Sequence, residues 1–196
     1  MNTLKAEKRD LSIKAKRLRR EGFVTGNVFG RQIKDSMPIQ IAEREAERLL
    51  KKSGKGSQVM LEVDSQTYDA LIKEVDYDSM KNQILEIDFQ ALVKGEKVHS
   101  VAEIVLLNHE KVSTGVVEQL LKEISYKALP EDLVEKVEVD TGNMHAGDTI
   151  KVKDLPIASN EKIDLMTDPE TAVVTVFEVH NAEAAEAAEG EDQADK

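Results

Sequence analysis

The side chains of this sequence that are best suited to do chemistry are cations crowded near its start. Residues 14–31 hold six lysines and arginines and one acid, Glu21, although the whole chain has a formal net charge of −11. Over residues 1–34, ten lysines and arginines face three acids, a balance of +7, so the remaining 162 residues sum to −18. This asymmetry predicts that one surface meets a polyanion while the rest of the molecule repels it. The alternative is a solvated basic surface without a partner.

Motifs of enzyme catalysis are weak in this sequence. Asp140–Thr141–Gly142 spells the tripeptide of retroviral-type aspartic proteases, but the chain has one copy, and Glu138 interrupts the apolar residues before it. We interpret this tripeptide as a turn. Residues 53–57, SGKGS, have too few spacers for a phosphate-cradling loop and are expected to link a helix to a strand. The sequence therefore predicts a protein that is not an enzyme.

Metal, cofactor and disulfide chemistry is not predicted either. The histidines His99, His109, His145 and His180 lie far apart without metal-ligand spacing, and the chain has no cysteine. We expect no metal and no cofactor. No segment approaches the ~20 apolar residues that cross a bilayer, and no apolar stretch follows the charged start. These features are typical of a cytoplasmic protein without a membrane partner.

Nucleic acid is the polyanion that the composition favours. Four Phe and three Tyr are too few for the stacking platforms that hold single strands. Duplex-like RNA fits better, because its wide, shallow minor groove admits side chains that contact phosphates and 2′-hydroxyls. One predicted helical stretch spreads four cations over a broad surface while Leu18 turns to the core. These cations are Lys16, Arg17, Arg19 and Arg20.

The elements that must position these cations form a predicted first domain, residues 1–92. Its apolar and polar residues alternate as in strands, interrupted by two helical patterns that Gly22 and Gly54 close. Asp64–Ser65–Gln66 signals a hairpin. We expect a β-rich α+β domain with two small helices. The predicted strands cover 3–9, 24–30, 38–42, 57–64, 67–75 and 82–93, and the predicted helices cover 14–21 and 43–53.

A second, all-β domain is predicted over about residues 95–180. Strand patterns cover 97–108, 111–129, 149–155 and 170–180, and a short turn of helix is expected within 129–137. Turn-forming residues separate these segments at 141–143 and 146–148. The last residues, 181–196, hold six acids, one base and no large apolar side chain. They predict a disordered acidic tail, because they bury too little surface to offset their ordering entropy.

Seven collinear segments resemble one protein family. They are LKAEKR (4–9), KRLRREG (16–22), VFG (28–30), LLKKSG (49–54), IDFQALVKGEKV (87–98), GVVEQLLKEISYKALPEDL (115–133) and GDTIKVKDL (147–155). Through them the chain, to about residue 180, resembles the long form of the bacterial large-subunit ribosomal proteins that bind 5S ribosomal RNA (5S rRNA), also called the Ctc general stress proteins. The resemblance implies a mainly β fold, in which a small N-terminal β-barrel with helices docks in the minor groove of an irregular 5S rRNA stem and a second β-rich domain follows.

The resemblance also implies the residues that contact RNA. Phe29 stands where a Tyr is usual, with a place in the core as the alternative, and Lys73 stands where a Gln is often found. The implied partners are 5S rRNA and the large ribosomal subunit. The RNA-contacting residues carried over by position are Arg9, Lys16, Arg19, Phe29, Lys73 and Asp88, and charge adds Lys14, Arg17 and Arg20.

Two departures from the family pattern bear on RNA affinity. Leu11–Ala15 replaces a Gly-Lys-Gly-Ala-Ser turn, so close approach of the backbone to RNA through glycine is lost. Asp76–Ser79 replaces a segment that commonly contains His and Pro, and Glu86 replaces a frequent His. The added acids predict weaker binding or a different cognate RNA.

The sequence thus predicts a ribosomal 5S rRNA-binding protein with a stress-related role. The alternative is a protein-binding adaptor or general stress factor that acts off the ribosome through its second domain and tail.

Overall fold

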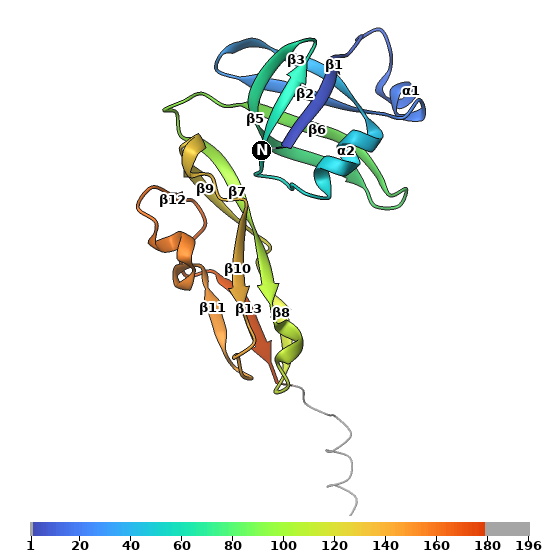
Figure 1. Ribbon diagram of the computed structural model, residues 1–196. Coiled ribbons are helices and arrows are strands. Elements are labelled where there is room, and N and C mark those ends of the chain that lie inside the picture. The colour runs from blue at the N-terminus through green and yellow to red at the C-terminus, as the bar shows by residue number, and fades with distance from the viewer. Residues whose placement is uncertain (1, 179–196) are drawn as a thin grey trace, which may run out of the picture.

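The computed structural model describes residues 2–178, which form two β-rich units in succession (Figure 1). The first is a closed six-stranded barrel with two helices outside it, and the second contains two smaller sheets. The predicted fold class, mainly β with a small barrel followed by a second β-rich domain, is confirmed. No helix among residues 2–178 is long and apolar enough to cross a membrane. His180 and the acidic segment 181–196 lie outside the described residues.

The barrel closes because its first strand pairs in parallel with its fourth. Alternate residues of the strands point inward, and Val28, Ile39 and Phe89 are fully buried there. All six predicted strands are present, and β3 and β5 extend beyond their predicted bounds through residues 33–37 and 76–78. The strands, ordered β1-β3-β2-β6-β5-β4, are β1 (Asn2–Lys8), β2 (Phe23–Gly30), β3 (Ile33–Ala42), β4 (Gln58–Val63), β5 (Gln66–Asp78) and β6 (Gln83–Ala91).

The predicted hairpin joins β4 to β5 through Asp64 and Ser65. Both residues have positive φ, 45° and 77°. Two consecutive left-handed residues match the twist of the flanking strands, which favours a tight two-residue turn.

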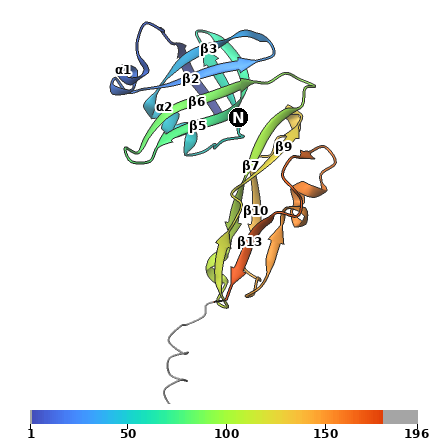
Figure 2. The ribbon, with the colours of Figure 1, turned by 180° about the vertical axis from the view of Figure 1, so that it is seen from behind.

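The two helices lie on the same side of the barrel, with α1 farther from the second unit than α2 (Figures 1 and 2). They are α1 (Ala15–Arg20), anchored by buried Leu18, and α2 (Glu43–Leu50), which buries Ala46 and Leu49. The Glu43 amide donates a hydrogen bond of 2.9 Å to the Gly22 carbonyl. The end of α1 therefore adjoins the start of α2.

The second unit has two sheets around one core. Tyr126 is fully buried in it, and its hydroxyl donates to the Val134 carbonyl at 2.8 Å. One sheet, ordered β10-β7-β9-β12, has β7 (Val98–Leu107), β9 (Glu123–Ala128), β10 (Lys136–Asp140) and β12 (Asp164–Leu165). The other, ordered β11-β13-β8, has β8 (Val116–Gln119), β11 (Thr149–Lys151) and β13 (Ala172–Phe177). The 3-10 helices are η1 (His109–Lys111), η2 (Pro130–Asp132), η3 (Val152–Asp154) and η4 (Pro156–Ser159).

Two predicted strands in this unit have wrong bounds. The single strand predicted over 111–129 is two strands, β8 and β9, in different sheets, because the chain breaks where the Leu120 and Leu121 amides both donate to the Val173 carbonyl. The short helical turn expected within 129–137 is present as η2, whereas β10, which pairs in parallel with β7, was not predicted. The strand predicted over 149–155 stops at Lys151, where η3 begins, and β12 was not predicted.

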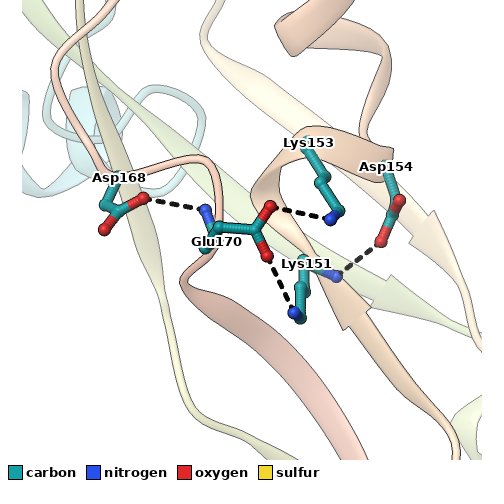
Figure 3. A network of polar contacts seen from close by, with 5 residues as sticks. All are labelled: Lys151, Lys153, Asp154, Asp168 and Glu170. Carbon is teal, nitrogen blue, oxygen red and sulfur yellow. Dashed lines mark hydrogen bonds and ion pairs between the residues drawn. The ribbon is translucent and has the colours of Figure 1, made fainter.

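A small polar network ties η3 to the loop before β13 (Figure 3). Glu170 accepts hydrogen bonds from Lys151 Nζ at 2.9 Å and Lys153 Nζ at 2.7 Å, and its own amide donates to Asp168 at 2.9 Å. The Lys151 amide donates to Asp154 Oδ2. The two lysines lower the pKa of Glu170 to about 2.

The barrel and the second unit touch at Gly56. The Gly56 carbonyl accepts from Ser100 Oγ at 3.3 Å, and the ion pair between Lys55 and Glu123 spans 3.6 Å. Gly56 has a φ of +84°, and a Cβ added there would lie 1.9 Å from the Val101 carbonyl oxygen. Only a residue without a side chain permits this approach.

Candidate nucleic-acid interface

Helix α1 presents most of the predicted RNA-contacting cations. It packs against β2 through buried Leu18, which leaves its polar side exposed. Arg17 is 72% exposed, and its Nε donates to Glu21 Oε1 at 2.9 Å. An ion pair this exposed contributes little stability in water. The Arg17 guanidinium can therefore exchange the Glu21 carboxylate for a phosphate. The other exposed cations of this segment are Lys14, Lys16 and Arg20.

Arg19 differs from its neighbours because it is bonded into the barrel. Its Nε donates to the Leu85 carbonyl at 3.0 Å, an acceptor that it shares with Thr25 Oγ1. Leu85 is the extra residue of a bulge in β6, since Asp76 pairs with Glu86 while Tyr77 pairs with Ile84. Arg19 therefore holds α1 against the barrel.

Arg9 organises the loop before α1. Its amide donates to the Pro38 carbonyl, its Nη2 donates to the Ile13 carbonyl at 3.2 Å, and its Nε is buried without a partner among residues 2–178. Asp10 accepts from the Ser12 amide at 2.8 Å, and hydrogen bonds from Ser12 lower its pKa. No residue of 10–15 has a positive φ. The loop that replaces the glycine-containing turn is thus an ordinary right-handed or extended backbone.

The outer surface of β2 and β6 carries the predicted residues Phe29 and Asp88. Phe29 is half-buried and is not part of the barrel's core cluster. Asn27, which the sequence analysis missed, donates through Nδ2 to Glu86 Oε1 at 3.0 Å and to Asp88 Oδ1 at 3.2 Å. The signal for Asn27 was its alternation with the inward-facing Val28, its neighbour in β2. Asn27 thus holds two carboxylates in place on this surface.

The surface of β5 and β6 is acidic. Glu74 pairs with Asp88 and Asp76 pairs with Glu86 across the two strands. Directly opposed like charges are unfavourable in a sheet, and they repel phosphate. The departures at positions 76 and 86 thus lie side by side.

Lys73 lies apart from α1, at the junction of the two units. It is the extra residue of a second bulge, in β5, and its Nζ donates to the His99 carbonyl at 2.8 Å. Burial, and then the nearby charge of Lys55, lowers the pKa of Lys73. The exposed cations are therefore grouped on α1, and Arg19 connects that helix to the surface of β2 and β6. Lys73 lies apart from α1 and from this surface.

The weak catalytic motif has a structural role. Asp140 accepts from Asn108 Nδ2 and from the Gly142 amide, both at 2.9 Å, so the Asp-Thr-Gly tripeptide is a turn, as predicted. These hydrogen bonds lower the pKa of Asp140. Residues 2–178 contain no cluster of three or more acidic or histidine side chains placed to hold a metal ion.

Comparison with known proteins identifies the family. Residues 4–89 match the model of the Ribosomal L25p family, and residues 97–180 match that of the C-terminal domain of ribosomal protein TL5. The large ribosomal subunit protein bL25 of Caldanaerobacter subterraneus subsp. tengcongensis is 30% identical over 98% of each chain. The chain belongs to the long-form bacterial bL25 (Ctc) family.

Two further relatives carry the same description. The bL25 protein of Burkholderia cenocepacia is 31% identical over 90% of each chain. That of Bacillus pumilus is 27% identical over 95% of this chain and 90% of its own. The resemblance drawn from the seven segments is confirmed, and membership of a family of structural ribosomal proteins confirms that the chain is not an enzyme.

Proposed function

We propose that this protein binds 5S rRNA as a structural component of the large ribosomal subunit, in the bacterial cytoplasm, with α1 at the RNA interface. The observation that carries the proposal is the exposed cluster of Lys14, Lys16, Arg17 and Arg20 on a short helix docked to the barrel. Family membership supports the ribosomal setting, because the relatives are large-subunit proteins by name.

Electrostatics would orient the protein on the RNA. The first 34 residues carry +7 and the rest of the chain −18, so an approach that brings the N-terminal cations to the RNA is favoured over other orientations. Exposed lysines and arginines that neutralise phosphates release counterions, which makes binding strong at low salt and weak at high salt. The acidic remainder would keep the second unit away from RNA.

The predicted residues take different roles in this proposal. Lys14, Lys16, Arg17 and Arg20 contact phosphates or 2′-hydroxyls, while Arg19 fixes α1 and Arg9 shapes the loop before it. Asp88 can accept a hydrogen bond from a 2′-hydroxyl or a base amino group, and half-exposed Phe29 can pack against a ribose or base. Lys73 reaches RNA only by giving up the His99 carbonyl.

Titration of 5S rRNA with the full-length chain at several salt concentrations tests the proposal. Lys16→Gln/Arg20→Gln should lower the slope of log affinity against log salt by about 1.4–1.8, at 0.7–0.9 for each phosphate contact. Lys111→Gln/Lys122→Gln, the control, removes two exposed lysines from the second unit and should leave the slope unchanged. Equal slopes for both double variants, or a wild type without affinity for 5S rRNA, would overturn the proposal.

A further inference from the structure

A second group of cations lines a groove between β1 and α2. The groove encloses about 230 Å³, and its floor includes buried Leu4 and Leu49. Lys5 lines it from β1, and Arg48 and Lys52 line it from α2 and the residues that follow. None of these three cations is ion-paired within residues 2–178, and Glu45 is the one carboxylate of the lining.

The fold explains why these side chains converge. Positions 45, 48, 49 and 52 follow the spacing that places residues on one side of a helix, and Leu49 of this set turns to the core. Lys5 alternates along β1 with the buried Leu4 and Ala6, so it stands on the outside of the barrel. Because α2 packs against β1, the two sets of cations border the same hollow.

The groove lies about one short helix away from the basic surface of α1. The Gly22 carbonyl, just past α1, accepts from the first amide of α2, and eight helical residues span about 12 Å. Figure 1 shows β1 and α2 in front, with α1 beside them. In the closed barrel, the neighbours of β1 are β3 and β4, so β4 separates β1 from the acidic strands β5 and β6. The positive charge of the groove thus lies at the C-terminal end of α2 and on β1, and the acidic first turn of α2, with Glu43 and Glu45, separates it from α1.

The alternative to a phosphate site is that these cations only stabilise helix α2. Cations near the end of a helix stabilise its dipole, which accounts for Arg48, Lys51 and Lys52 alike. It does not account for Lys5, which is on a strand. Lys51 is as near the helix end as Lys52 but does not line the groove, so the two roles separate by experiment.

We propose that the β1–α2 groove binds a backbone phosphate of RNA, as a second phosphate site beside α1. The inference rests on the proposed function, because it takes the RNA to be the one that α1 contacts. Lys5, Arg48 and Lys52 supply the donors and charge, and the apolar floor limits the water that competes for the phosphate. Glu45 weakens the site by like-charge repulsion.

A pair of charge-matched double variants of the full-length chain tests the site. Arg48→Gln/Lys52→Gln removes two groove cations, and Arg44→Gln/Lys51→Gln removes two exposed cations of the same segment that do not line the groove. The first should lower the salt slope of 5S rRNA binding by about 1.4–1.8, or about 25- to 60-fold in affinity at 0.1 M salt. The second should leave the slope unchanged. Thermal unfolding checks that both variants are folded.

The outcomes distinguish the groove from the proposed function. A wild type that does not bind 5S rRNA overturns both. If Lys16→Gln/Arg20→Gln weakens binding but the two α2 double variants behave alike, only the groove is overturned. Glu45→Gln should increase RNA affinity whereas Glu47→Gln, on the same helix but outside the groove, should not. Pyrophosphate can be titrated while the amide resonances of Lys5 and Arg48 are followed by NMR. If it shifts them saturably, and Arg48→Gln/Lys52→Gln keeps the wild-type salt slope of 5S rRNA binding, the groove binds small phosphate compounds. That result contradicts the RNA assignment.

Discussion

The close approach of the two units at Gly56 makes a quantitative prediction for the substitution Gly56→Ala. A Cβ there would lie 1.9 Å from the Val101 carbonyl oxygen and 3.1 Å from Ser100 Oγ, so the backbones must separate by more than an ångström. Overpacking of this kind costs about 1–3 kcal/mol. The positive φ of +84° adds about 1–2 kcal/mol for any residue with a Cβ.

Gly95→Ala separates these two costs. Gly95 has nearly the same φ, +80°, and a Cβ there would meet no atom within 4 Å. It therefore reports the backbone strain alone. We expect Gly56→Ala to lose about 1–3 kcal/mol more free energy of unfolding than Gly95→Ala.

Urea unfolding and small-angle X-ray scattering measure the two possible responses. Loss of stability beyond the Gly95→Ala control means that the junction stays packed under strain, and a larger radius of gyration means that the units separate. If Gly56→Ala matches Gly95→Ala in both stability and radius of gyration, the packing of Gly56 against Val101 is refuted.

Three further substitutions test separate parts of the structure. Arg19→Ala should lower the free energy of unfolding by about 1–3 kcal/mol, because it removes a donor from the half-buried Leu85 carbonyl, whereas Arg20→Ala should have almost no effect; equal losses in urea unfolding would contradict the role of Arg19. Glu86→His should raise 5S rRNA affinity about tenfold at low salt, because it removes a carboxylate that repels phosphate from the acidic surface of β5 and β6, and the gain should shrink as salt rises; unchanged or weaker binding by a folded variant would remove position 86 from the interface. The pKa of Glu170 falls from its ordinary 4.5 to about 2, so folding favours the ionised form, and the stability it contributes is present above pH 4.5 and lost as the pH falls toward 2. Glu170→Gln should therefore lose less stability than wild type between these pH values, while the exposed control Glu161→Gln should follow wild type; identical pH profiles for Glu170→Gln and wild type would show that the network of Figure 3 does not persist in solution.

Local patterns were sufficient to predict the barrel strands and α1. Alternation identified all six strands, and the single large apolar residue of the helix, Leu18, is the one that is buried. Closure was beyond a local pattern, because β1 pairs with β4, more than fifty residues further along the chain. In the second unit, the apolar run around Leu120 and Leu121 hid the point at which the chain changes sheets.

The roles of individual cations were less predictable than their location. Arg19 and Arg20 are adjacent and chemically identical, yet only Arg19 reaches the carbonyl that the β6 bulge exposes. Lys73 is fixed by a carbonyl of the second unit, and neither bulge leaves a mark in the sequence. The groove cations Lys5, Arg48 and Lys52 come together only when α2 packs on β1. Tertiary contacts, which the sequence pattern does not encode locally, decide these roles.

The most direct test of the ribosomal role is the sedimentation of the full-length chain from a bacterial extract on a sucrose gradient. The proposed function predicts that the chain sediments with the large ribosomal subunits, in amounts comparable to 5S rRNA, and that high salt releases it. A chain that stays at the top of the gradient at low salt, without 5S rRNA bound to it, would contradict the proposal and favour an adaptor that acts off the ribosome.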